Sequence, residues 1–256
     1  MIISSQFVSR IDLKPDAGAN ANVSQYPFNL PAIRSLGTLE LHPKVTYFVG
    51  ENGSGKSTLL EALAVSMGYN AEGGSRDLRF QTRDTHSGLH DRLRVSKGFR
   101  RPRTGYFLRA ESFYNVASSL DQIEEDPLTA GVLASYGGRS LHAQSHGESF
   151  LSLVMNRFGP EGLYLLDEPE AALSPQRQLV MLARLHQLVR QQSQFVIATH
   201  SPILMAYPDA WIYQFGADGI QRIDYEDTEH YRITRDFLAN PQRMLNVLLE
   251  ETDEDE

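Results

Sequence analysis

A glycine-rich stretch of nine residues, Gly50 to Thr58 (GENGSGKST), constrains the fold of this chain more than any other feature. It follows a short run of β-forming apolar residues, Val45 to Val49, and precedes a segment, Thr58 to Met67, whose apolar residues recur with helical period. A strand, a turn of the pattern G-x-x-x-x-G-K-[ST] and a helix in this order are typical of a phosphate-binding loop. We therefore expect an α/β fold in which this loop lies at the carboxyl end of a strand.

The chemistry of this phosphate loop suits a nucleoside triphosphate. Its glycines let successive backbone amides converge on phosphates, and the start of the following helix adds a favourable partial charge. Lys56 is expected to reach the β- and γ-phosphates, and the Ser57 hydroxyl to bind Mg²⁺. The predicted nucleotide contacts in the loop are Gly50, Glu51, Asn52, Gly53, Ser54, Gly55, Lys56, Ser57 and Thr58. The alternative, a glycine-rich turn that binds nothing, is disfavoured because pattern and context agree.

Two acidic residues follow a second apolar run. Leu163 to Leu166 are typical of a strand buried on both faces, and Asp167 and Glu168 stand at its end. At the end of a neighbouring strand, Asp167 can hold Mg²⁺ through water, and Glu168 can act as the general base toward the attacking water. An acidic pair after an apolar run is by itself more often a solvated strand end. Its combination with the phosphate loop favours the catalytic interpretation.

A histidine follows the next apolar run. Phe195 to Ala198 predict another buried strand, with His200 just beyond its end. A single histidine in this place is usually structural, but beside a phosphate loop it can contact the γ-phosphate and sense hydrolysis. Lys56, Glu168 and His200 are thus the predicted catalytic residues, and Ser57 and Asp167 the predicted metal ligands.

The stretch His142 to Met155 (HAQSHGESFLSLVM) allows two interpretations. Ser145, followed three residues later by Glu148, fits a capping box at the start of an amphipathic helix. The same residues could form half of a nucleotide site, because the start of a helix binds anions. One interpretation does not exclude the other, since the hydroxyl that caps the helix can exchange its hydrogen bond within the helix for one to a phosphate.

The order of these motifs resembles that of the ABC-type ATPase superfamily. The phosphate loop (Walker A) comes first, then SHGES at 145, LLDEPE (Walker B) at 165, AALSP at 171 and ATHSP at 198. Ser145 and Gly147 match the serine and second glycine of the family's signature, whereas His146 replaces the first glycine. Ala172 to Ser174 resemble its intersubunit loop, with serine in place of aspartate. The resemblance covers nearly the whole chain, and compact stand-alone ATPases of the AAA-labelled group, with segments like FLRAESF, are the most similar.

This resemblance implies a mechanism. In that family the signature helix points at the γ-phosphate of a nucleotide held by the opposite subunit, which makes two composite sites in a head-to-tail, two-fold homodimer. A glutamine usually couples Mg²⁺ to the lobe that contacts partners. Gln81 is one candidate for it, while Arg109 has the better spacing but a different chemistry. Tyr26 and Phe28 are the candidates for an aromatic contact to adenine.

The domain organisation follows from the same motifs. We expect one ABC-type ATPase domain over residues 1–249, built on a mixed sheet flanked by helices, with a small inserted lobe at approximately 70–145. The interval between Gln81 and Ser145 is too short for the long coiled coils of SMC-type proteins. Six of the last seven residues, 250–256, are acidic, so this tail should repel itself and remain disordered.

Composition excludes several classes of protein. The chain has no cysteine, which excludes disulfides and thiolate metal sites. No run of 18 apolar residues occurs, and the N-terminus lacks the pattern of a signal peptide, so we expect a cytoplasmic protein without membrane insertion. The net charge is −8, yet residues 76–109 hold ten basic and three acidic residues. Its most basic part, 92–103, is either a solvated surface that contacts the chain's own acids, such as the 250–256 tail, or a site for a nucleic-acid backbone.

Taken together, the motifs predict a Mg²⁺-dependent ATPase that converts ATP to ADP and phosphate. Binding and hydrolysis would close and open a homodimer coupled to nucleic acid or to a protein effector. Two alternatives remain open at this level. One is the ATP-binding subunit of a membrane transporter, and the other is a nucleotide-gated switch with negligible turnover.

Overall fold

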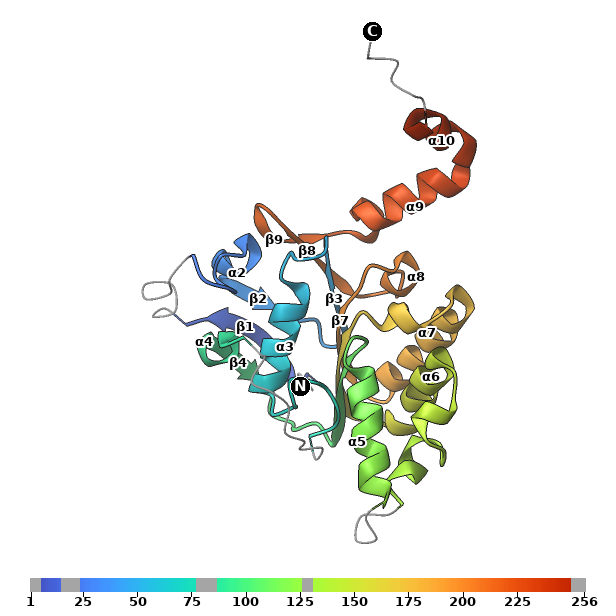
Figure 1. Cartoon of the computed structure of the whole chain (residues 1–256). Coiled ribbons are helices and arrows are strands. Elements are labelled where there is room, and N and C mark those ends of the chain that lie inside the picture. Colours follow the sequence, from blue (N-terminus) through green and yellow to red (C-terminus); the bar gives the residue numbers. More distant parts are fainter. Residues whose placement is uncertain (1–5, 15–23, 77–86, 126–130, 250–256) are drawn as a thin grey trace.

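The computed structural model describes residues 6–14, 24–76, 87–125 and 131–249. Two β-sheets organise this part of the chain (Figure 1). The larger has six strands in the order β5-β6-β7-β3-β8-β9, and the smaller has three in the order β2-β1-β4. The larger sheet consists of β3 (Val45–Val49), β5 (Thr104–Arg109), β6 (Gly162–Asp167), β7 (Gln194–Ala198), β8 (Trp211–Gly216) and β9 (Gly219–Ile223). The smaller consists of β1 (Val8–Leu13), β2 (Thr38–Glu40) and β4 (Leu93–Lys97).

The larger sheet is parallel except at one edge, where β9 forms an antiparallel hairpin with β8. Apolar residues fill its central strands without alternation, because helices or a second sheet cover both of its faces. Parallel strands direct their carboxyl ends to one edge, so the segments that follow β3, β5, β6 and β7 meet there. The expectation of an α/β fold with a mixed sheet flanked by helices is confirmed.

Each face of this sheet has its own core. On one face, α3 (Lys56–Ser66) lies between the two sheets with α2 (Pro31–Arg34) and α4 (Leu89–Arg92) nearby. On the other face pack α5 (Phe113–Glu125), α6 (His146–Arg157), α7 (Pro175–Arg190) and α8 (Pro202–Met205). Successive residues of one strand point to opposite faces of the sheet and so belong to different cores. In β6, Tyr164 packs in the core with α5 to α8, and Leu165 packs in the core with α3.

The interval of approximately 70–145 is divided between these layers. β4 pairs with β1 in the small sheet. β5 is the edge strand of the large sheet, and α5 packs on that sheet's second core. The interval is therefore not separate from the sheet in this structure. Gln81 and the acidic tail 250–256 lie outside the described residues.

The last two helices form an arm that leads away from the sheets (Figure 1). These are α9 (Glu229–Ala239) and α10 (Pro241–Leu249). Neither helix has a buried residue, which sets the arm apart from helices of the body such as α3, α6 and α7. In the described part of the chain, no helix combines the length and the hydropathy that crossing a membrane requires.

Candidate functional site

The phosphate loop connects β3 to α3 in a conformation that requires glycine. Gly50, Gly53 and Gly55 all have positive φ angles, and a Cβ on Gly50 would lie 2.3 Å from the carbonyl oxygen of Phe215. Gly55 precedes α3, and no side chain caps the amides of this helix start. These amides are therefore available to an anion.

Lys56 lies within this loop and is almost completely buried. Its Nζ donates to the carbonyl oxygens of Gly50 at 2.7 Å and Glu51 at 2.8 Å. Burial lowers the pKa of the ammonium group, while the carboxylates of Glu168 and Asp167 act in the opposite direction. The charge thus sits at the centre of the loop, where a phosphate can replace the two carbonyl contacts.

Asp167 reaches the phosphate loop from two strands away. The sequence suggests that the acidic strand is the neighbour of β3, but β7 lies between β6 and β3. Ser57 Oγ nevertheless donates a 2.8 Å hydrogen bond to Asp167 Oδ1. Burial raises the pKa of this carboxyl group to about 6, although the hydrogen bond from Ser57 lowers it. A buried carboxylate and a hydroxyl in contact are hard oxygen donors that fit Mg²⁺.

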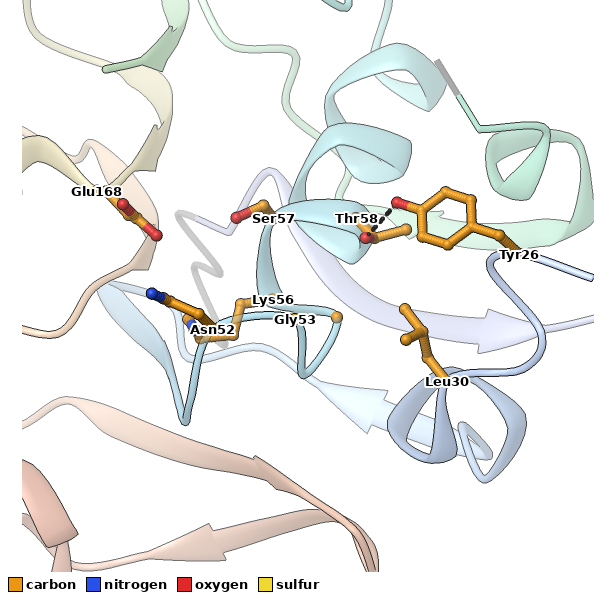
Figure 2. A pocket seen from close by; sticks show the side chains of 9 residues that line it. Tyr26, Leu30, Asn52, Gly53, Lys56, Ser57, Thr58 and Glu168 are labelled. Atoms are coloured by element: carbon orange, nitrogen blue, oxygen red, sulfur yellow. Dashed lines mark hydrogen bonds between the residues drawn. The ribbon is translucent and has the colours of Figure 1, made fainter. Parts of the chain in front are cut away.

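Glu168 stands where the chain turns away from β6. Its φ of 50° lies in the left-handed region, which is uncommon for a residue with a Cβ. Its backbone amide donates to Ala198 at 2.9 Å, and its carboxylate is partly exposed. The carboxylate borders a cavity of about 230 Å³ shared with Asn52, Lys56 and Ser57, and faces them across the loop (Figure 2). This placement suits a general base for water at a terminal phosphate.

His200 also reaches this rim. Its Nε2 lies 3.5 Å from Glu168 Oε1, and its backbone amide donates to Glu170. Its Nδ1 lies 2.9 Å from Nε2 of His230, a residue of α9. Burial and the nearby charge of Lys56 lower the pKa of His200. His230 and the half-buried Glu170 were not predicted from the sequence. Glu170 stands in the LLDEPE motif, but no spacing rule connects His230 to that motif.

Arg109 occupies the edge of the site. It ends β5 and is the ladder partner of Asp167. Its Nε lies 3.6 Å from Asp167 Oδ2, and its Nη1 donates to Glu61 at 2.8 Å. A guanidinium has no lone pair for a metal, so Arg109 can hold the Asp167 carboxylate but cannot ligate Mg²⁺ as a glutamine oxygen can. Gln81, the other candidate for the glutamine position, lies outside the described residues.

Of the two aromatic candidates, Tyr26 borders the phosphate loop. It is exposed, lines the same cavity as Lys56, and its hydroxyl is 2.8 Å from Thr58 Oγ1 (Figure 2). Phe28 instead packs against the core between the two sheets. Tyr26 therefore lies where the base or ribose of a loop-bound nucleotide can reach it, on the side of the loop opposite Glu168.

The signature segment is occupied by contacts within its own chain. Ser145 is the N-cap of α6, and its amide and hydroxyl both donate to Glu148 Oε2, at 3.1 and 2.6 Å. A Cβ on Gly147 would lie 2.5 Å from Arg177 Nη1 and 2.6 Å from the carbonyl oxygen of Ala172. The capping box is confirmed. Within the described residues, no hydrogen bond or ion pair joins Ser145 or Gly147 to the phosphate loop of the same chain.

The residues next to Ser145 and Gly147 also make contacts within their own chain. His146 packs edge-on against Phe113, with ring centroids 5.7 Å apart. In the AALS loop, Leu173 is buried, and Ser174 accepts a hydrogen bond from the amide of Arg177 as the N-cap of α7. The signature and the AALS loop therefore lie next to each other, linked by Arg177, which also pairs with Glu148 at 3.3 Å.

The basic segment 92–103 is partly neutralised by its own chain. Arg100 pairs with Glu161 at 2.7 Å, and Arg103 approaches the same carboxylate at 3.5 Å. The acid partner is thus Glu161, whereas the 250–256 tail lies outside the described residues. Arg94, Lys97 and Arg101 remain exposed on the surface.

Two family models and one curated relative match parts of this chain. Residues 28–123 match a family described as "AAA domain", and residues 147–206 match one described as "AAA domain, putative AbiEii toxin, Type IV TA system". A stretch of 44 residues is 50% identical to the DNA replication and repair protein RecF of Colwellia psychrerythraea, covering 17% of this chain and 11% of that protein.

Two solved structures have a similar arrangement of strands and helices. The SMC head domain of Thermotoga maritima has 15% identity and a TM-score of 0.46, with 86% of this chain and all of that chain covered. The cbiO1 protein of Clostridium perfringens, part of an ABC transporter complex, has 14% identity and a TM-score of 0.47, with 95% of this chain and 99% of that chain covered.

Proposed function

We propose that this chain is an ABC-type P-loop ATPase that binds ATP with Mg²⁺ and hydrolyses it to ADP and phosphate. The observation that carries the proposal is the contact of Ser57 with Asp167 beside the buried Lys56, with Glu168 facing the same cavity. Side chains from two segments far apart in the sequence, 56–57 and 167–168, thus lie together at one site. A glycine-rich turn that binds no ligand would not need such an arrangement.

Each group has a distinct role in this proposal. Lys56 exchanges its two carbonyl contacts for the β- and γ-phosphates, and the amides of the loop and of the first turn of α3 bind the remaining phosphate oxygens. Ser57 and Asp167 would hold Mg²⁺, which would supply positive charge to offset that of the bound triphosphate. Glu168 orients the attacking water and accepts its proton, while His200 donates a hydrogen bond to the γ-phosphate.

We further propose that the second half of the site comes from another copy of the chain. Ser145 begins a helix whose N-terminus can bind a phosphate, yet it makes no contact with its own phosphate loop among the described residues. In a head-to-tail homodimer the Ser145 hydroxyl would leave Glu148 for the γ-phosphate held by the other subunit. Closure would then depend on ATP, and hydrolysis would release it.

Nucleic acid is the coupled partner that we favour over a protein effector. The relative with 50% local identity is a DNA replication and repair protein, although the matched stretch is a small part of it. The exposed basic residues Arg94 and Lys97 of β4, and Arg101 after it, are compatible with a phosphate backbone. A cytoplasmic location would be consistent with this role.

The primary test compares wild type with Lys56→Ala. Binding of a fluorescent ATP analogue and release of phosphate are measured with Mg²⁺ present. The variant should bind the analogue about 100-fold more weakly or worse, because it removes a charge aimed at the phosphates. Lys44→Ala is the matched control, since Lys44 is an exposed lysine paired with Asp209 outside the site. Equal binding by wild type and Lys56→Ala would refute the proposed function.

A further inference from the structure

Two imidazole rings are in contact at the rim of the proposed nucleotide site. His200 follows β7, and His230 lies in the first turn of α9. Their Nδ1 and Nε2 atoms, respectively, are 2.9 Å apart, and the ring planes meet at 62°. This distance is that of an N–H···N hydrogen bond, in which one nitrogen must carry a proton and the other must not.

The surroundings favour the neutral form of both rings. Burial lowers the pKa of each ring below the ordinary 6.5, and the charge of Lys56 lowers both further, against the smaller opposing effects of Glu168 on His200 and of Glu229 and Glu51 on His230. A neutral imidazole has a single N–H. Only two arrangements of the pair are then possible, and they differ in which ring donates.

The outer nitrogens decide between these arrangements. His200 Nε2 is buried, lacks a hydrogen-bond partner among the described residues, and lies 3.5 Å from Glu168 Oε1. If His200 donated through Nδ1, the bare lone pair of Nε2 would face that carboxylate, which is repulsive. If His230 donates through Nε2, the proton of His200 is on Nε2 and points toward the carboxylate. The second arrangement is electrostatically favoured, and in both arrangements the Nδ1 of His230 is buried without a partner among the described residues.

We propose that His230 is a positioning residue, whose Nε2–H donates to Nδ1 of His200 and, together with the Glu168 carboxylate, holds His200 in the tautomer protonated at Nε2. That tautomer is the hydrogen-bond donor that a terminal phosphate needs, so the inference rests on the proposed function for its biological meaning. The tautomer itself is a property of the nucleotide-free protein. It can therefore be measured whether or not ATP is hydrolysed.

This contact connects the arm to the nucleotide site. α9 has no buried residue, yet its first turn places His230 against His200, and Glu229 borders a cavity shared with Glu51 and Asn52 of the phosphate loop. α9 continues into α10, away from the sheets (Figure 1). A displacement of the arm would remove the donor from His200 without touching the phosphate loop.

The first test is ¹⁵N NMR of the histidine side chains in nucleotide-free protein. We expect His200 to be protonated at Nε2 in wild type and in His230→Gln, because the glutamine amide supplies a donor at nearly the same place. His230→Leu should keep the proton on Nε2, since Glu168 still faces that nitrogen, whereas His230→Glu should place a proton on Nδ1, because a carboxylate only accepts. His186→Leu, which removes an exposed histidine that contacts Tyr207, is the control and should leave His200 unchanged.

The second test is steady-state hydrolysis. His230→Leu and His230→Glu should lower kcat by about 10-fold with little change in KM, while His230→Gln stays within about threefold of wild type. A purely structural contact would instead give equal decreases for the Gln and Leu variants. Wild-type His200 protonated at Nδ1, or an Nδ1 of His200 that carries no proton in His230→Glu, would overturn the inference. The expected tautomers together with an absence of hydrolysis would overturn the proposed function alone.

Discussion

The phosphate loop and the signature segment are both helix starts, but their local chemistry is opposite. At the start of α3 no side chain caps the amides, and the ammonium group of Lys56 donates to two backbone carbonyl oxygens. At the start of α6, Ser145 and Glu148 satisfy each other, and Gly147 lies against Arg177 and Ala172. The first helix start can accept an anion at once, whereas the second must first release its own cap. This difference is expected of a site that one chain begins and another completes.

The largest expected effect lies on the phosphate-loop side. Glu168→Gln should bind ATP normally and lower turnover by at least about 100-fold, because the amide keeps the shape but cannot accept a proton from water. Phosphate release and analogue binding are measured on the same samples. Glu226→Gln, a change of an exposed acid on the short helix at Tyr225–Asp227, should leave both unchanged. Hydrolysis at the wild-type rate by Glu168→Gln would remove the assigned base.

Asp167, the proposed Mg²⁺ ligand, should make the stability of the protein depend on pH. The pKa of Asp167 is raised from 3.8 to about 6 in the folded protein, so its favourable contribution is complete below about pH 4 and is lost as pH rises through 6. Without Mg²⁺, wild type should therefore lose up to about 3 kcal/mol of stability relative to Asp167→Asn between pH 4 and pH 7. Urea unfolding with EDTA measures this difference.

Added Mg²⁺ should diminish that pH dependence, because a cation favours the ionised carboxylate. The same unfolding series with Mg²⁺ in place of EDTA provides the comparison. If the difference between wild type and Asp167→Asn is independent of pH in EDTA, the carboxylate is not desolvated as the structure indicates.

A smaller effect should separate the two interpretations of Ser145. Asp and Asn cap helices about as well as Ser, but only Asp would present a negative charge to a phosphate. In the Glu168→Gln background, ATP and Mg²⁺ should produce a dimer by light scattering. Adding Ser145→Asp should weaken it by about 10-fold or more, whereas Ser145→Asn should not. Unfolding of both variants without nucleotide controls for the cap itself, and equal dimers from both would mean that this segment is only a helix cap.

The smallest effect concerns the basic segment, where part of the charge is already paired. Arg94, Lys97 and Arg101 are exposed, and changing all three to Glu should weaken binding of labelled duplex DNA in the presence of ATP. The log–log salt slope should fall by about 0.9 for each DNA phosphate that the variant no longer neutralises. The matched variant Arg100→Gln, which breaks the pair with Glu161, should change binding less. No binding by wild type at low salt would favour a protein effector over nucleic acid.

The local sequence was sufficient to predict where the elements that build the site begin and end. The phosphate loop, the strands that carry Asp167 and His200 and the capping box of α6 lie where their patterns predict, because glycine geometry, buried apolar runs and capping act within a few residues. Arg109 could be placed at a strand end, but its contact with Asp167 depends on β5 pairing with β6.

The sequence by itself thus determined which groups end the strands and begin the helices. Only the tertiary structure decided which of these groups meet. Strand order is set by the packing of two cores on opposite faces of one sheet, and no local pattern encodes that β7 separates β6 from β3. The pairing of His200 with His230 across 30 residues has the same cause: a long-range contact arises from how whole elements bury their apolar faces, not from the spacing of the residues that touch.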